Sequence, residues 1–396
     1  MRALRVLHVT QPTTAGVARW VAALAQDQSS RGWDVTVASP QGWIQEECER
    51  LGVRHVLWEA SRSPGRSTRG EIRTLRQIVR RGGFDVVHLH SSKAGLAGRL
   101  ALRGALPTVF QPHCWSFQAA GGAMGRASLA WEKFAARWAS SIVCVSNEEK
   151  RIGAEAGIPA DRLVVIRNGV DLKTWTARSN ADRAAARAQL GVESGVPVVV
   201  TVGRLAEQKG QDLLLAAWPK VREAVPEARL YLVGDGPMRP QLEQLARSTE
   251  GVHLIGDTDG VADWYAAADV VALPSRWEGL ALAVLEAAAS GRSVVATNVS
   301  GMEEVLSEDG ASGGAVVPLE SPELATELAN AVIARLRDPQ LALSEGDHGR
   351  ARVEAAFDLR EAARQTAVLA VDLASTGRTP LFERESAVAS TLQVEP

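Results

Sequence analysis

The segment DVVALPSRWEGLALAVLEAAASGRSVVAT, from Asp269 to Thr297, contains a strand, a loop, a helix and a second strand in succession. Its apolar runs DVVALP and SVVAT flank an Ala- and Leu-rich stretch that we expect to be helical from about Ala281 until Gly291 stops it. Two strands joined by a helix are typical of a parallel sheet. The loop leads from the end of a strand to a helix N-terminus, whose free amides favour an anion such as phosphate.

The same alternation of Val- and Ile-rich runs with longer helical segments extends over most of the chain. We expect a first series of strands at 4–10, 34–39, 54–58, 85–90, 107–111, 141–146 and 163–167, and a second at 197–203, 229–234, 252–256, 269–274, 293–297 and 314–318. A polar stretch near 171–194 separates the two series. The predicted fold is α/β, with two Rossmann-like, doubly wound parallel-sheet domains facing one another across a cleft.

The length of 396 residues suits this division, because each half is large enough to bury its own core. We expect an N-terminal domain over 1–178, a C-terminal domain over 179–355, a helix over 356–374 that returns to the N-terminal domain, and a disordered tail over 375–396.

Composition narrows the class of protein. Hydrophobic residues make up 46% and charged residues 23%, as in soluble globular proteins. The net charge of −2 gives no reason to expect a nucleic-acid partner. Cys48, Cys114 and Cys144 are too far apart for a redox pair or a zinc ribbon, and neither a signal peptide nor a membrane-spanning run is evident. We therefore expect a cytoplasmic protein.

Two glutamates stand out in the opening segment. Glu278 falls in the loop and Glu286 inside the helix, and eight residues of helix rise about 12 Å. A glycosidase pair needs carboxyl groups roughly 5–10 Å apart across one bond. The two therefore suit hydrogen bonds to hydroxyls at opposite ends of one ligand, although two solvated glutamates would show the same pattern.

Two further strand-end segments offer anion-binding groups. In VGRLAEQKG (202–210), Arg204 and Lys209 could neutralise a diphosphate, and a solvated basic loop is the alternative. In LHVTQPTTAGVARW, Gly16 lies in a turn before a helix predicted to begin near Val17, so the backbone there could approach a phosphate. The sequence lacks G-x-G-x-x-G, which argues against a nicotinamide-dependent oxidoreductase.

The histidines of the first half show no familiar zinc spacing, so we expect no metal from His88, His90 and His113. His113 precedes Trp115 and Phe117 and could touch a sugar ring. A structural histidine is the alternative reading.

An arginine stripe recurs at steps of three and four residues in a predicted amphipathic helix from Thr68 onward. It consists of Arg69, Arg73, Arg76 and Arg80. Such a stripe could contact anionic lipid at the inner face of a membrane. An ordinary solvated crossover helix is the alternative.

Together these segments resemble the retaining glycosyltransferases of the GT-B fold, specifically family four (glycosyl transferases group 1). The strongest motifs are E-x7-E at Glu278 and Glu286, and GR-x4-KG from Gly203 to Gly210. The supporting motifs are SSKAGLAGR (91–99), VSNEEK (145–150), VIRNGVD (165–171), VGDGP (233–237) and YAAADVVALPS (265–275).

The resemblance implies a nucleotide-sugar donor, most commonly a UDP-sugar, as co-substrate, with no cofactor and no metal. It assigns the donor to the C-terminal domain and a hydroxyl acceptor (a glycan, a lipid-linked intermediate or a natural product) to the N-terminal domain. The implied roles are ribose binding by Glu286, diphosphate binding by Arg204, Lys209 and Gly16, and donor-sugar contacts by Glu278, His113 and the backbone of Gly279 and Leu280. Catalysis would rest on His113, Glu278, Arg204 and Lys209.

The sequence departs from the family at two places. Ala15 precedes Gly16 where the family often has Gly-Gly, and the frequent Phe after Gly279 is replaced by Leu280. A hexose-type transfer with retention is the expected activity, in polysaccharide biosynthesis or, as the alternative pathway, in natural-product tailoring. A nucleotide-sugar epimerase of similar fold and a non-catalytic sugar- or nucleotide-binding protein are the alternatives.

Overall fold

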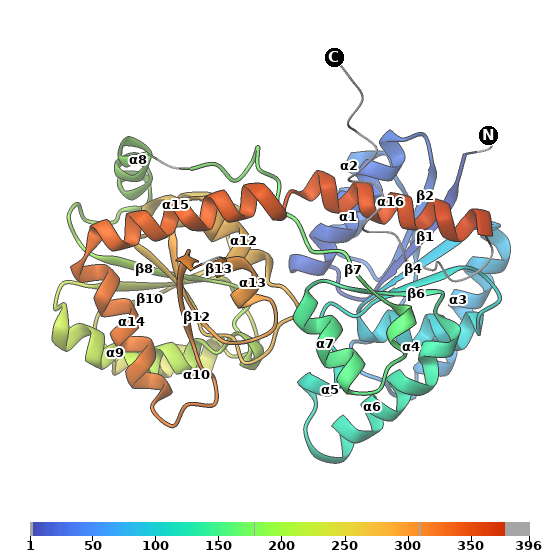
Figure 1. Ribbon diagram of the computed structural model, residues 1–396, viewed down its shortest axis with the longest axis horizontal. Coiled ribbons are helices and arrows are strands. Elements are labelled where there is room, and N and C mark those ends of the chain that lie inside the picture. The colour runs from blue at the N-terminus through green and yellow to red at the C-terminus, as the bar shows by residue number, and fades with distance from the viewer. Residues whose placement is uncertain (1–2, 178, 309, 377–396) are drawn as a thin grey trace. The chain divides into compact units, whose positions relative to one another are not determined.

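The computed structural model of the chain describes residues 3–177, 179–308 and 310–376 and divides into two compact units (Figure 1). Unit 1 comprises the chain up to Ile166 and the part from Ala363 onward, and unit 2 comprises Arg167–Ala362. The sequence had placed the boundaries at 178 and 355. Most of the tail predicted over 375–396 lies outside the described residues.

Unit 1 is built on a parallel sheet. Its strands are β1 (Arg5–Thr10), β2 (Asp34–Ser39), β3 (Arg54–Leu57), β4 (Val86–His90), β5 (Thr108–Gln111), β6 (Ser141–Cys144) and β7 (Leu163–Val165). They are ordered β3-β2-β1-β4-β5-β6-β7. The order reverses between β1 and β4, which pair in parallel with His8 opposite His88.

Helices cover both faces of this sheet. They are α1 (Ala15–Ser30), α2 (Trp43–Leu51), α3 (Thr68–Gly82), α4 (Ser91–Leu102), α5 (Ser116–Ala119), α6 (Gly122–Ala135) and α7 (Asn147–Glu155), with short 3₁₀ turns η1 (Ala136–Trp138) and η2 (Ala160–Arg162). One core joins α3 and α4 to the sheet, as in the packing of Leu75 with Leu89, and another joins α1 and α2, as in that of Val21 with Val37. Burial on both faces explains why the strands read as continuous apolar runs.

Unit 2 repeats the plan. Its main strands are β8 (Val198–Val202), β9 (Arg229–Val233), β10 (Val252–Gly256), β11 (Val270–Leu273), β12 (Ser293–Thr297) and β15 (Gly314–Val317), in the parallel order β10-β9-β8-β11-β12-β15. Two short strands that the sequence did not predict, β13 (Ser307–Glu308) and β14 (Ala311–Ser312), pair antiparallel.

The helices of unit 2 follow its strands. They are α8 (Asn180–Leu190), η3 (Glu207–Lys209), α9 (Gln211–Ala224), α10 (Arg239–Arg247), α11 (Val261–Ala267), α12 (Leu282–Ala289), α13 (Met302–Leu306), α14 (Leu324–Arg337) and α15 (Pro339–Ala356). The last helix, α16 (Leu359–Thr376), begins in unit 2 and continues into unit 1.

In both sheets the strand order reverses at one place, between β1 and β4 in unit 1 and between β8 and β11 in unit 2. Doubly wound sheets bind ligands beyond the carboxyl ends of the strands at such a reversal. The functional groups of each unit are therefore expected at these two places.

Candidate active site

The loops after β8 and β11 hold one another in unit 2. The amide of Arg276 donates to the carbonyl of Gln208 at 2.7 Å, and Nε2 of Gln208 donates to the carbonyl of Trp277 at 3.1 Å. Gly210 has φ +63°, and a Cβ on it would lie 1.9 Å from the carbonyl oxygen of Pro274. The chain can bring the two loops this close only because residue 210 is glycine.

Lys209 and Glu278 meet where these loops touch. Nζ of Lys209 lies 2.6 Å from Oε1 of Glu278, which also accepts from the Ser275 hydroxyl at 2.8 Å. Nε2 of Gln208 donates to Oε2 at 3.3 Å. Glu278 is only 5% exposed, so its carboxylate is neutralised and fixed by three donors rather than by water. The sequence named both residues but gave no sign that they form a pair.

Arg276, which the sequence motifs do not include among the site residues, is a second cation in this region. Arg276 binds Asp212 through both terminal nitrogens, at 2.8 and 2.6 Å. Hydrogen bonding to Asp212 is the main reason that the pKa of Arg276 lies above its ordinary value. The bidentate pair ties the β11 loop to α9.

Glu286 occupies the second turn of α12, which starts at Leu282 after Ala281, as predicted. Its side chain is buried, and Oε2 accepts from the hydroxyl of Tyr265 at 3.3 Å. Arg204 lies on the loop after β8, where its carbonyl accepts from Nε2 of Gln211 at 3.1 Å. Arg204 and Glu286 thus belong to the segments that leave the two strands at the reversal of strand order.

Asn168 positions the backbone beside Glu278. Its Nδ2 donates to the carbonyl of Leu280 at 2.9 Å, and the side chain is buried. The sequence contains Asn168 in VIRNGVD, yet no spacing relates it to a loop more than 100 positions away. Its contact holds the backbone at Leu280, which the family resemblance assigns, together with Gly279, to the donor sugar.

The predicted residues of unit 1 lie where β1 and β5 end. Helix α1 begins at Ala15, before the predicted start at Val17, so Gly16 contributes to the first helical turn rather than to a preceding loop. Ala15, with φ +60°, makes the tight turn that brings the helix start forward. A first-turn amide such as that of Gly16 has no partner within its own helix.

Backbone strain concentrates at the same edge of the sheet. Three non-glycine residues with φ in the left-handed region lie on the segments that leave these strands: Ala15 after β1, Ser91 after β4 and His113, with φ +58°, after β5. Cys114 also has positive φ, at +142°. Such conformations cost of order 1–3 kcal/mol each and cluster at binding sites.

Glu149 and Trp115 support the turn that carries His113. The Glu149 carboxylate accepts from the amides of Val145 and Cys114, and burial raises its pKa to about 7. The indole of Trp115 donates to the carbonyl of Glu149 at 2.7 Å and is buried, so this ring packs in the core. Trp115 is therefore a structural residue.

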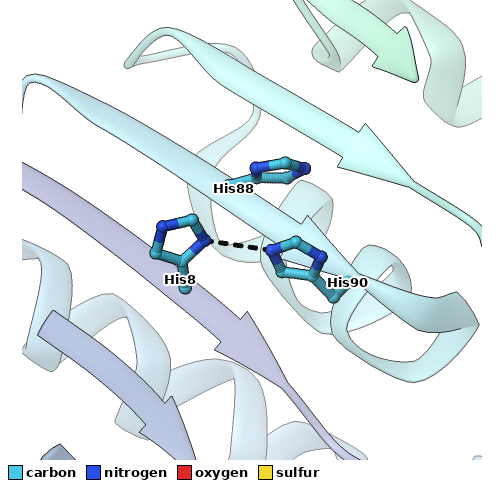
Figure 2. Close-up of side chains that lie close together, drawn as sticks. All are labelled: His8, His88 and His90. Carbon is cyan, nitrogen blue, oxygen red and sulfur yellow. Dashed lines mark hydrogen bonds between the residues drawn. The ribbon is translucent and has the colours of Figure 1, made fainter. Parts of the chain in front are cut away.

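Four histidines gather at the ends of β1, β4 and β5, three of which Figure 2 shows. Nδ1 of His8 lies 3.0 Å from Nε2 of His90, and Nδ1 of His90 lies 3.2 Å from Nε2 of His113. The ring of His88 stacks on that of His90, with centroids 3.9 Å apart. Desolvation lowers the pKa of His8 to about 4 and that of His113 to about 3, and it also holds the pKa values of His88 and His90 well below their ordinary range. All four rings are thus neutral at pH 7.

His8, His88 and His90 also come close enough to be considered as metal ligands, with one nitrogen of each within 4.8 Å of the others. The sequence reasoning left His8 out, because nothing in its spacing joins it to residues about 80 positions away. Parallel pairing of β1 with β4 creates the group. The group contains neutral imidazoles and no carboxylate to balance the charge of an ion.

Only part of the arginine stripe of α3 is exposed to solvent. Arg69, Arg73 and Arg80 are exposed. Arg76 is half-buried, and its guanidinium donates to the carbonyls of Leu100 and Ala101 at the end of α4. No helix within the described ranges is both long and apolar enough to cross a membrane.

Comparison with known proteins fits this arrangement. Residues 14–174 match the family described as Glycosyltransferase Family 4, and residues 196–338 match Glycosyl transferases group 1. The alpha-maltose-1-phosphate synthase of Mycolicibacterium smegmatis is 32% identical over 304 residues, covering 71% of this chain and 77% of that protein. An Escherichia coli enzyme named UDP-Gal:alpha-D-GlcNAc-diphosphoundecaprenol alpha-1,3-galactosyltransferase is 30% identical over 58% of this chain and 61% of its own.

Solved structures agree on the architecture. The HepE protein of Anabaena, crystallised with UDP and glucose, superposes with a TM-score of 0.79 at 22% identity, over 93% of this chain and 100% of that one. The two doubly wound parallel sheets and this likeness confirm the predicted GT-B fold. The chain is a member of glycosyltransferase family 4.

Proposed function

We propose that the protein transfers a hexose-type sugar from a nucleoside diphosphate, most readily UDP, to a hydroxyl group of its acceptor, with retention of anomeric configuration and without a metal. The acceptor is a glycan, a lipid-linked intermediate or a natural product. The observation that carries the proposal is the contact of Lys209 with buried Glu278 at the strand reversal of unit 2. The UDP-sugar and the lipid-linked acceptor named for the Escherichia coli relative favour these two classes.

In this proposal unit 2 binds the donor. Lys209 and Arg204 stabilise the departing diphosphate, as cationic side chains do when charge develops on a leaving group. An ammonium group has three donor hydrogens, so Lys209 can keep its bond to Glu278 and still bind a phosphate oxygen. Glu278 accepts from sugar hydroxyls beside the backbone of Gly279 and Leu280, and Glu286 accepts from those of the ribose.

Unit 1 contributes two groups to the proposal. Gly16, in the first turn of α1, offers a backbone amide to the diphosphate. His113, neutral because burial lowers its pKa to about 3, contacts the donor sugar. Attack on the same face as the departing phosphate, with a phosphate oxygen taking the acceptor proton, gives retention.

The test is a panel of UDP-, GDP- and dTDP-hexoses with candidate acceptors, in buffer containing EDTA, with detection of released nucleoside diphosphate. We expect acceptor-dependent release of UDP from a UDP-hexose, and a product whose anomeric configuration by NMR equals that of the donor. Conversion of the sugar without an acceptor would indicate an epimerase. Binding without release for every donor would leave a non-catalytic binding protein, and loss of turnover in EDTA would exclude the metal-independent mechanism.

A further inference from the structure

We propose that Gln28, His8 and His90 form a hydrogen-bonded chain that sets the tautomer of His113, so that His113 presents an unprotonated Nδ1. We call these four residues the histidine chain. The tautomer itself follows from unit 1 alone. Its importance for catalysis rests on the proposed function, in which His113 contacts the donor sugar.

Gln28 sets which nitrogen donates and which accepts in each hydrogen bond of the histidine chain. Oε1 of Gln28 lies 2.9 Å from Nε2 of His8, and an amide oxygen can only accept a hydrogen bond. Nε2 of His8 must therefore carry hydrogen. Both side chains are almost completely buried, so water does not offer an alternative partner.

A neutral imidazole has one N–H and one lone pair, so a ring that donates through one nitrogen must accept through the other. The donor and acceptor roles therefore carry over from each histidine to the next. Nδ1 of His8 is left with the lone pair and accepts from Nε2 of His90, as the dashed line in Figure 2 marks. Nδ1 of His90 then accepts from Nε2 of His113. The hydrogen of His113 is thereby committed to Nε2.

The free nitrogen of His113 is consequently an acceptor. His113 has φ +58° and lies two residues after β5, and it is partly exposed whereas His8 and His90 are buried. A lone pair at Nδ1 suits the hydroxyl hydrogen of a sugar and disfavours a carboxylate. His8, His90 and Gln28 are thus positioning residues that act through His113.

The hydrogen bond between His8 and His90 is incompatible with a metal ion bound by His8, His88 and His90. An ion would have to replace the hydrogen that Nε2 of His90 shares with Nδ1 of His8, breaking the chain at its centre. The rings of His88 and His90 stack with 29° between their planes. Lone pairs lie in the ring plane, so those of two stacked rings run alongside each other rather than converging on one point.

The experiment reads the tautomers directly. Protein labelled with ¹⁵N-histidine is studied by long-range ¹H–¹⁵N correlation at pH 7.5, which distinguishes protonated from unprotonated ring nitrogens. His113→Asn identifies the signals of His113. We expect protonated Nε2 and unprotonated Nδ1 at His8, His90 and His113.

Variants at Gln28 test the direction, since position 28 lies three hydrogen bonds from His113. Gln28→Glu keeps an acceptor and should preserve the pattern. Gln28→Lys supplies a donor and should reverse the pattern, moving the hydrogen of His113 to Nδ1. Should Gln28→Lys not fold, Gln28→Leu and His90→Gln serve instead, and both should give mixed tautomers at His113. His88→Phe keeps the stacked ring outside the chain and should leave the pattern unchanged.

Activity provides the second measurement. We expect kcat/KM for the donor to fall about tenfold or more in Gln28→Lys and to recover in Gln28→Glu. An unchanged His113 tautomer in Gln28→Lys and His90→Gln would overturn the proposal, as would stoichiometric zinc binding by the wild-type protein that His8→Asn abolishes. If the tautomers behave as expected but no donor is turned over, the histidine chain stands and the proposed function fails.

Discussion

Lys209 places its ammonium 2.6 Å from Oε1 of Glu278, although the two residues lie 69 positions apart on loops that follow different strands. The carboxylate is buried and the lysine is partly exposed. The pair therefore has one member that needs its partner to balance charge and one member that can still reach a ligand. This asymmetry lets structural and catalytic effects be separated experimentally.

Lys209→Met should lower both stability and turnover. Loss of the ammonium leaves the Glu278 carboxylate uncompensated, at a cost of about 1–3 kcal/mol. Loss of a cation at the leaving group should reduce kcat about 100-fold or more. The double variant Lys209→Met/Glu278→Gln should recover the stability of unit 2 but not kcat, as urea unfolding and steady-state kinetics would show. Full activity in Lys209→Met would remove the phosphate assignment.

Glu286 should decide how well the enzyme recognises ribose. We expect Glu286→Gln to raise the KM for a UDP-hexose about tenfold or more, because a charged acceptor of hydroxyl hydrogen bonds is lost. The wild-type enzyme should prefer the ribose donor to its 2′-deoxy analogue, and the variant should show little preference. Tyr265→Phe, which removes only the hydroxyl that donates to Glu286, is the matched control and should retain the preference.

Gly210 should tolerate no side chain. In Gly210→Ala the new Cβ would lie 1.9 Å from a backbone oxygen, so the loops after β8 and β11 must separate. Gly191 has nearly the same φ, +68°, but nothing lies within 4 Å of a Cβ there. Gly191→Ala should cost only about 1 kcal/mol. Equal destabilisation of the two variants in chemical unfolding would contradict the close approach of the loops.

Stability of unit 1 should fall as the pH is lowered from about 6.5 towards 4. His8, His88, His90 and His113 have folded-state pKa values below that of the unfolded chain, so the unfolded chain takes up protons first. Between its unfolded-state and folded-state pKa values, each histidine lowers the free energy of unfolding by about 1.4 kcal/mol for every pH unit of acidification. The pKa of Glu149 is raised to about 7, so the folded state protonates this carboxyl first and gains stability as the pH falls. This gain offsets the loss from about one histidine.

Amide hydrogen exchange of β1 and β4, corrected for the intrinsic dependence on pH, would measure this effect. Protection should decrease steadily below pH 6.5, and a flat profile would mean that the rings are charged in the folded state. Glu149→Gln removes the opposing group and should steepen the profile.

Membrane contact by α3 should depend on its exposed arginines. Each basic group near an anionic bilayer is worth about 1 kcal/mol, so changing Arg69, Arg73 and Arg80 to Gln should weaken vesicle binding roughly 100-fold. Arg76→Gln, which loses bonds to the end of α4, should lower stability more than binding. Sedimentation with anionic and neutral vesicles measures binding, and urea unfolding measures stability. Equal binding by the wild-type and triple-variant proteins would exclude the stripe as a lipid contact.

Local patterns predicted most of the fold because strands buried on both faces carry continuous apolar runs. All thirteen expected strands are present, with ends within two residues of those expected, and α12 begins where the sequence places it. The antiparallel strands β13 and β14 escaped prediction because two residues each are too few to show a period.

The candidate site was harder to predict because its contacts cross the sheets. The sequence supplied Lys209 and Glu278 but could not pair them, since their meeting depends on which strands are neighbours. His8 was overlooked for the same reason, and only the register of β1 against β4 sets it beside His90. Arg76 has the spacing of the arginine stripe, yet its guanidinium donates to the carbonyl of Leu100 at the end of α4.

The two ends of unit 2 meet in a small parallel bridge between Val170 and Asp358, where the amide of Val170 donates to Phe357 and that of Leu359 donates to Val170. The first and last segments of unit 2 therefore lie side by side within that unit. Exchanging the whole segment between homologous enzymes would therefore require only two splice junctions, which lie next to each other, and would leave the sheet that carries the four histidines unchanged.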